Sequence, residues 1–242
     1  MTSERSPRSI SVPSWLRPAK TVPITRWRSE RRWTGNPGTI AILILGLWLF
    51  GTGEALVVVS DLGNGPWTVM AQGLSLRTGL SIGWTTFIIS VSVLLLWIPL
   101  REKPGLGTIA NAVVIALALQ VGVTFLPHPE NVALQLFTVI AGIALIGLGS
   151  GLYLTTNLGP GPRDGWMTGV HRKTGWPIYG VRLGIEVIVV IIGWLLGGTV
   201  GIGTVLFALL IGPSVGYGLM AVGALAGAKT TTSSDDDPGL EA

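Results

Sequence analysis

Six apolar stretches, each long enough to cross a membrane as a helix, constrain this chain more than any other feature of its sequence. A helix needs about 20 apolar residues to span the hydrocarbon core of a bilayer. Charged residues make up only 12% of the chain, about half their share in soluble domains. The candidate spans are residues 38–60, 81–99, 106–126, 132–156, 177–196 and 202–226. The sequence therefore predicts an all-α polytopic membrane protein with six transmembrane helices.

The two ends of the chain differ in composition from the apolar part. Residues 1–36 contain eight lysines or arginines with tryptophans interleaved, a mixture that suits lipid headgroups on the cytoplasmic side of a membrane better than nucleic acid. Residues 229–242 are polar and acidic, which is typical of disorder. We expect a disordered basic tail over 1–36, a membrane domain over 37–228 and a disordered acidic tail over 229–242.

The positive charges predict how the chain is oriented in the membrane. Loops on the cytoplasmic side are enriched in lysine and arginine. If the N-terminus is cytoplasmic, Arg77 is the only basic residue in the segments on the opposite side, and six spans return the C-terminus to the cytoplasm. The first apolar run is of full spanning length, so we interpret it as a retained span and not as a cleaved signal peptide.

The sequence resembles itself at an offset of 96 residues, and residues 96 positions apart are called counterparts below. LGNGP at 62–66 falls on LGPGP at 158–162, and GLGT at 105–108 falls on GIGT at 201–204. Each unit, about 38–126 and 132–226, contains three spans, an odd number, so the second enters the membrane from the opposite side. The sequence thus predicts two inverted-topology repeats, an arrangement in which transporters hold their substrate between the repeats near the midplane.

Each predicted repeat contains a Gly-Pro break followed by a segment too short to span the membrane. The segments 66–77 and 162–174 begin with proline, which suits the first turn of a helix, and glycine follows each as a C-cap. We interpret them as half-helices whose free N–H groups favour anions. In the alternative interpretation the breaks only connect helices, Asp164 is a first-turn acid, and Arg163 is a charge that sets topology.

Three charged residues lie inside predicted spans, where a charge is costly and by default functional. Arg182 and Glu186 are four residues apart in the fifth span and can pair, while Glu54 lies in the first span. The pair has two interpretations: a structural ion pair that fixes helix packing, or a switchable pair at a substrate cavity. The predicted substrate-binding residues are Glu54, Gly65, Pro66, Gly161, Pro162, Arg163, Asp164, Arg182 and Glu186.

Other features favour packing over chemistry. Asn111 and Gln120 in the third span are expected to form hydrogen bonds between helices, and pairs such as Gly147/Gly151 and Gly212/Gly216 permit close helix contact. The chain has no cysteine, and none of its sequence forms a zinc-protease helix, a phosphate-binding loop or a credible nucleophile site. We therefore expect no enzyme activity, no catalytic residues, no cofactor and no metal.

Over residues 36–226 the chain resembles the YczE/YyaS/YitT-like family of bacterial integral membrane proteins, and its YczE-like branch most of all. The resemblance rests on LGNGPW, on LGPGPRDGWMTG followed by RKTG, on VRLGIE and on GGTVGIGTVLFALLIGP. It implies a multi-pass protein of the bacterial cytoplasmic membrane, without a family-wide activity.

Together these features favour a secondary transporter or permease for a small polar solute, with the half-helix N-termini and Arg163 favouring an anionic group. Glu186 and Arg182 are then expected to supply gating or proton coupling. The alternative is a membrane accessory or scaffold protein that transports nothing. A transporter needs a polar cavity between the repeats, which separates the two interpretations.

Overall fold

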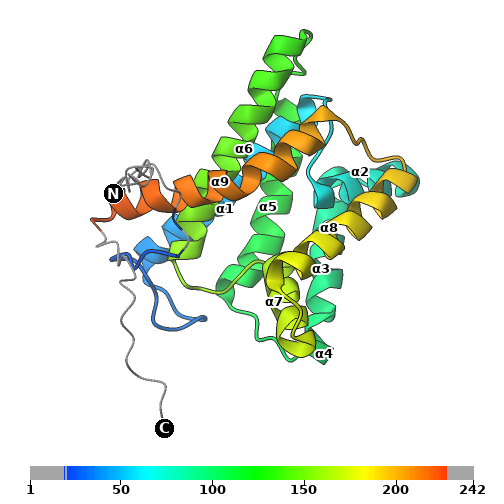
Figure 1. Ribbon diagram of the computed structural model, residues 1–242. Helices are drawn as coiled ribbons and strands as arrows, with labels where there is room; N and C mark the ends of the chain where they lie inside the picture. Colours follow the sequence, from blue (N-terminus) through cyan, green and yellow to red (C-terminus); the bar gives the residue numbers. More distant parts are fainter. Residues whose placement is uncertain (1–18, 20, 228–242) are drawn as a thin grey trace, which may run out of the picture.

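The computed structural model describes residues 19 and 21–227, and nine helices account for most of this part of the chain (Figure 1). They are α1 (Pro37–Val59), α2 (Pro66–Thr78), α3 (Ile82–Leu95), α4 (Trp97–Leu100), α5 (Leu106–Phe125), α6 (Val132–Thr155), α7 (Pro162–Thr174), α8 (Ile178–Leu195) and α9 (Ile202–Leu225). Counting α3 and α4 together, six of these are long and apolar enough to cross a membrane. Every end lies within one residue of the predicted span, so the six-helix prediction is confirmed.

The two short helices α2 and α7 begin and end as their sequences predict. Each starts at a proline after an extended glycine, Gly65 or Gly161, because a proline at the first position needs no backbone N–H partner. Each ends at a glycine, Gly79 or Gly175, with φ of 71°. Glycine adopts this left-handed conformation without steric cost.

Helices α1 and α6 cross in an antiparallel manner at the centre of the protein, with glycines at the crossing. A Cβ added at Gly53 would lie 2.6 Å from the carbonyl oxygen of Gly142, and one added at Gly46 would lie 2.9 Å from that of Gly149. Because the helices run in opposite directions, their C-terminal ends lie on opposite sides. Helix α2 follows one end and α7 the other, and these sides are called the α2 face and the α7 face below.

The turns that lead into α2 and α7 contact the starts of α9 and α5 in matching ways. Gly203 N donates a hydrogen bond to the carbonyl oxygen of Leu62 at 2.7 Å, and Gly107 N donates one to that of Leu158 at 2.8 Å. These donors are counterparts of one another, and so are the acceptors. In each half of the chain, the turn before the short helix is therefore held by a hydrogen bond from the other half.

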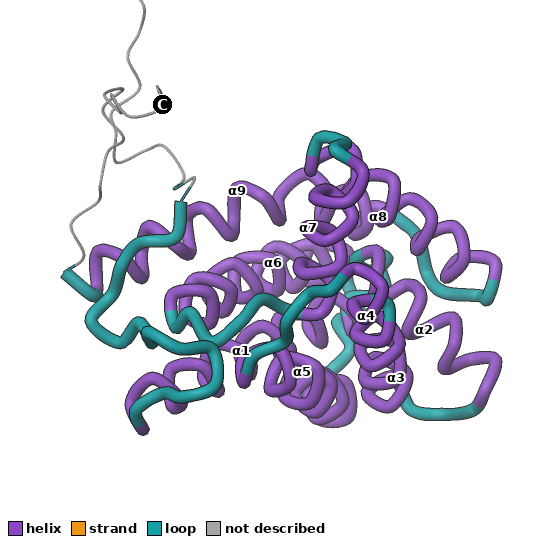
Figure 2. Tube along the Cα trace, turned by 90° about the horizontal axis from the view of Figure 1, so that it is seen from below, coloured by secondary structure: helices purple, strands orange, loops and turns teal. Residues whose placement is uncertain are grey.

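Equivalent helix pairs do not pack equally. Helix α3 lies against α5, whereas α8 and α9 have no comparable packing. In both views α8 and α9 diverge from the loop that joins them, and α8 lies beside α2 instead (Figures 1 and 2).

Part of residues 21–36, within the segment expected to be a disordered tail, contacts the end of α6. Thr25 and Ser29 are buried. Thr25 Oγ1 donates to the carbonyl oxygen of Thr155, and Ser29 N donates to that of Thr156 at 2.9 Å. The predicted acidic tail over 229–242, like residues 1–18, lies outside the described residues.

Candidate functional site

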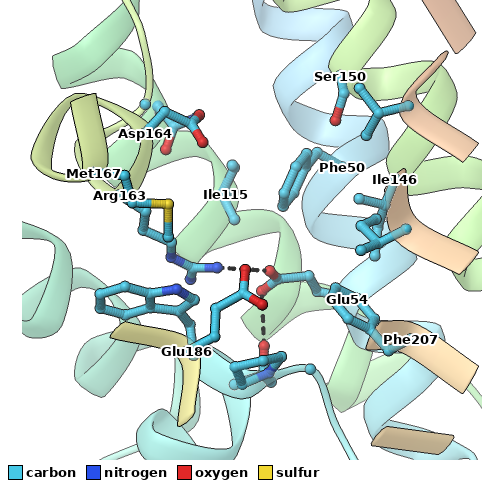
Figure 3. A pocket seen from close by; sticks show the side chains of 18 of the residues that line it. Phe50, Glu54, Ile115, Ile146, Ser150, Arg163, Asp164, Met167, Glu186 and Phe207 are labelled. Carbon is cyan, nitrogen blue, oxygen red and sulfur yellow. Dashed lines mark hydrogen bonds and ion pairs between the residues drawn. The ribbon is translucent and has the colours of Figure 1, made fainter. Parts of the chain in front are cut away.

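A pocket of about 330 Å³ lies between the two halves of the protein, with walls from α1, α2, α3, α5, α6, α7, α8 and α9. Eight of the nine predicted site residues line it, although they come from separate segments of the chain. They are Glu54, Gly65, Pro66, Gly161, Arg163, Asp164, Arg182 and Glu186. Figure 3 shows Arg163, Glu54 and Glu186 projecting into the same space from three helices.

Glu54 is the most deeply buried charge of the pocket, with 2% of its surface exposed. Its Oε1 accepts a hydrogen bond from Arg163 Nη1 at 3.2 Å, and its Oε2 accepts one from Thr68 Oγ1 at 3.2 Å (Figure 3). A carboxylate in such a place must be paired, because an isolated buried charge is very costly. The α2 and α7 helices each supply one of the two partners.

Arg163 reaches Glu54 because it is the first residue after the proline that starts α7. Its guanidinium also lies over the ring of Trp67, 5.2 Å from the ring centroid, a distance at which the cation and the π system attract. Trp67 holds the same position in α2 and is the counterpart of Arg163. The interpretation of Arg163 as only a topology-setting loop charge does not account for this placement.

Asp164 also faces the pocket, from the first turn of α7. Its Oδ2 accepts a hydrogen bond from the hydroxyl of the buried Tyr153 at 3.0 Å, and the start of a helix favours a negative charge. The carboxylate and the hydroxyl therefore occupy the region that the free N–H groups of α7 would otherwise present to a ligand.

Arg182 and Glu186 form the ion pair that their spacing predicts, with 2.8 Å between Arg182 Nε and Glu186 Oε1. About half of the Arg182 side chain is exposed and a quarter of that of Glu186. Both line the pocket, and both are more exposed than Glu54. The structure therefore pairs each arginine of the pocket with one glutamate.

Pro162 is the one predicted site residue that does not line the pocket. It is buried, and its carbonyl oxygen accepts a hydrogen bond from Trp97 Nε1 at 2.9 Å. Pro162 therefore positions Arg163 and Asp164 by fixing the start of α7 and does not meet the cavity itself.

Fifteen residues that sequence reasoning did not assign to the site also line it, and seven of them are apolar residues or glycine: Ile115, Ile146, Leu154, Met167, Ile211, Gly212 and Val215. The others carry aromatic rings or polar groups. They are Phe50, Trp67, Thr68, Ser90, Ser150, Tyr153 and Phe207, together with Asn111, which was expected to serve helix packing. For some of them, comparison with the counterpart 96 residues away indicates a place at the site. Ser150 is the counterpart of Glu54 and Ser90 that of Glu186, so equivalent positions of both halves face one cavity.

No metal centre is evident in the described part of the chain, where no three histidine or acidic side chains are grouped in a way that could hold an ion. The pocket carboxylates instead have arginine, threonine or tyrosine partners. The pocket therefore combines a largely apolar lining with a few paired charges and hydrogen-bonded groups.

Comparison with known proteins gives a consistent classification. The sequence pattern of DUF6198, a family of unknown function, matches residues 38–218. An uncharacterized protein of Haemophilus influenzae is 43% identical over 206 residues, which cover 85% of this chain and 94% of that protein. The uncharacterized membrane protein YczE of Bacillus subtilis is 33% identical over 75% of this chain and 82% of its own length. The uncharacterized protein YyaS of the same organism is 26% identical over 69% and 86%. No solved structure matches the chain.

Proposed function

The chain belongs to the DUF6198 family of YczE-like membrane proteins, and we propose that it is a secondary transporter for a small polar solute. We further propose that its halves are inverted-topology repeats in the bacterial cytoplasmic membrane, with both termini in the cytoplasm. The antiparallel crossing of α1 and α6 and the matched hydrogen bonds of Gly107 and Gly203 support the repeats.

The observation that carries this proposal is the location of the charged pocket. Transporters built from inverted repeats bind their substrates between the repeats, at broken helices. Here the broken segments 61–66 and 157–162 meet one cavity that also contains Glu54, Arg163 and the Arg182–Glu186 pair. A cavity of about 330 Å³ is at the lower end of the size range of small-molecule sites.

We propose that the solute has an anionic group, and that this group competes with Glu54 or Glu186 for an arginine. The first residues of α2 line the pocket and include no acidic residue, so this helix start favours negative charge there. Because each arginine already has a carboxylate partner, binding would exchange one charge-assisted hydrogen bond for another. Such an exchange makes the ion pairs responsive to the solute, as gating or proton coupling requires.

A second candidate is a membrane accessory or scaffold protein without transport activity. The observation that favours it is that each arginine of the pocket already has a glutamate partner, as in a purely structural pair. A structural pair can be replaced by apolar residues at little cost in stability. A substrate site cannot lose its charges without losing affinity.

A thermal-stability screen of the detergent-solubilised protein tests the proposal, with small carboxylates, phosphate, amino acids, amines and inorganic cations as probes. A probe at a hundred times its dissociation constant stabilises the folded protein by about 2.7 kcal/mol, which raises the melting temperature. We expect an anionic probe to raise it in the native protein and, at the same probe concentration, to raise it further in Glu186→Gln, because the loss of the Glu186 charge frees Arg182 for the anion.

Glu102→Gln is the matched control, because Glu102 pairs with Arg172 outside the pocket. This variant should respond to the probe as the native protein does. The accessory-protein alternative is favoured if no probe shifts the melting temperature of any of the three proteins.

A further inference from the structure

We infer that the structure is one of two conformations of this protein, open at the α7 face, and that in the other α8 closes on α9 while α3 leaves α5. This inference rests on the proposed function, since it describes how the pocket would be reached from each side. It is drawn from contacts that one half of the chain makes and the other half, at counterpart residues, does not.

At the α2 face, α3 is held against α5 by a close contact. Gly83 N donates a hydrogen bond to Gln120 Oε1 at 3.0 Å, and a Cβ at Gly83 would lie 2.8 Å from the carbonyl oxygen of Ala116. The start of α3 therefore lies directly on α5, and the pocket is closed between these two helices.

At the α7 face, the counterparts of these residues are apart. Tyr179, the counterpart of Gly83, has 74% of its surface exposed. A Cβ added at Gly212, the counterpart of Ala116, would meet no atom within 4 Å. The seam between α8 and α9 is thus open where the seam between α3 and α5 is closed, and Arg182 and Glu186 are partly exposed beside it.

The two short helices show the same difference. Gly193 of α8 lets the backbone of α2 approach closely at Val69 and Met70. Its counterpart in the first half is Trp97, whose ring lies beside Gly165, so that α7 meets a side chain where α2 meets the backbone of α8. Both differences close the α2 face and open the α7 face, so they describe one state and not two unrelated irregularities.

If the halves are repeats, each half can adopt the packing that the other shows. Exchanging the two arrangements places Tyr179 beside Gly212 and breaks the hydrogen bond between Gly83 and Gln120. Helix α8 then covers Arg182 and Glu186 from the α7 face, and the pocket opens between α3 and α5. Tyr179 carries a Cβ where Gly83 has none, so α8 is expected to approach α9 less closely than α3 approaches α5, and the open space at Gly212 accommodates part of the tyrosine side chain.

Disulfide trapping tests this inference directly, because the native chain contains no cysteine. The test variant is Tyr179→Cys with Gly212→Cys, two open positions at which the substitutions should be tolerated. The control is Tyr179→Cys with Leu210→Cys. Leu210 is the counterpart of Val114, which packs towards α1 and not towards α3. Both variants are oxidised with copper phenanthroline in native membranes, and the remaining free thiols are counted with a maleimide polymer.

We expect the test pair to lose its free thiols at least ten times faster than the control pair. Equal rates, in variants that melt as the native protein does, would overturn the inference. The outcome is separate from that of the ligand screen. If a probe raises the melting temperature but the disulfide does not form faster in the test pair, the protein binds the probe in a single conformation. If the disulfide forms faster but no probe raises the melting temperature, the second conformation exists but does not serve transport of the tested probes.

Discussion

Arg163 and Glu54 are joined at 3.2 Å although 109 residues separate them, and the bond links the first helix of one half to the short helix of the other. It forms at the point where α7 begins, so the break at Pro162 determines where the guanidinium is placed. The glutamate is almost fully buried, and its carboxylate is paired with this arginine and accepts a hydrogen bond from the hydroxyl of Thr68.

Removing one member of this pair should destabilise the protein strongly. Arg163→Gln leaves Glu54 buried without a cation, and breaking a buried pair costs about 3–5 kcal/mol. Chemical or thermal unfolding in detergent measures the loss. Arg172→Gln, which breaks an ion pair whose arginine is exposed, should cost less than about 1 kcal/mol. The prediction is wrong if the two variants lose similar amounts.

Exchanging the charges of the Arg182–Glu186 pair separates its two interpretations. In Arg182→Glu with Glu186→Arg the pair is kept and the acid precedes the base, which is the better order in a helix. We expect unfolding free energy within about 0.5 kcal/mol of the native value and loss of the melting-temperature shift produced by the probe that the screen identifies. A variant that keeps the shift would indicate that the pair is only structural.

A side chain at the crossing of α1 and α6 should disrupt the packing of the two helices. In Gly53→Ala the new Cβ would lie 2.6 Å from the carbonyl oxygen of Gly142, and overpacking of this kind costs about 1–3 kcal/mol. Gly184→Ala, in α8, introduces the same methyl group where no atom lies within 4 Å and should not lower stability. Equal effects of the two substitutions on unfolding would contradict the role assigned to the crossing.

Loosening the contact between α3 and α5 should favour the second conformation. Gln120→Ala removes the acceptor of the Gly83 N–H group, and one such hydrogen bond contributes about 0.5–1.5 kcal/mol. In the background of Tyr179→Cys with Gly212→Cys we therefore expect disulfide formation to become roughly two- to tenfold faster. Gln135→Ala removes a different glutamine hydrogen bond, at the start of α6, and should leave the rate unchanged.

Local signals account for what the sequence predicts correctly. The six spans and the two short helices follow from hydropathy and from Gly-Pro and glycine punctuation, each of which acts over a few residues. The Arg182–Glu186 pair is also local, since its members are one helical turn apart. These interactions join residues that are close in the sequence, so the features can be predicted without knowing the tertiary structure.

The rest depends on which helices meet. Nothing near Glu54 in the sequence indicates Arg163 as its partner, and Trp67 and Phe207 face the pocket only because α2 and α9 are placed there. The packing of Thr25 and Ser29 against α6 likewise reflects hydrogen bonds to a distant carbonyl group and not the composition of residues 21–36. The opening between α8 and α9 is marked in the sequence only by differences between counterparts, such as Tyr179 for Gly83 and Gly216 for Gln120.

The glycines of the central crossing have a consequence for how such a chain can diverge. Gly46 and Gly142 are counterparts, as are Gly53 and Gly149. At the crossing, however, Gly46 contacts Gly149 and Gly53 contacts Gly142, so each contact joins a glycine from one pair of counterparts to a glycine from the other pair. A larger residue at any of the four glycines collides with the backbone of the other helix. A larger residue at its counterpart causes the equivalent collision. Evolution of the two halves is thus tied together at these four positions, and they can change only by compensating moves that separate both helices at once.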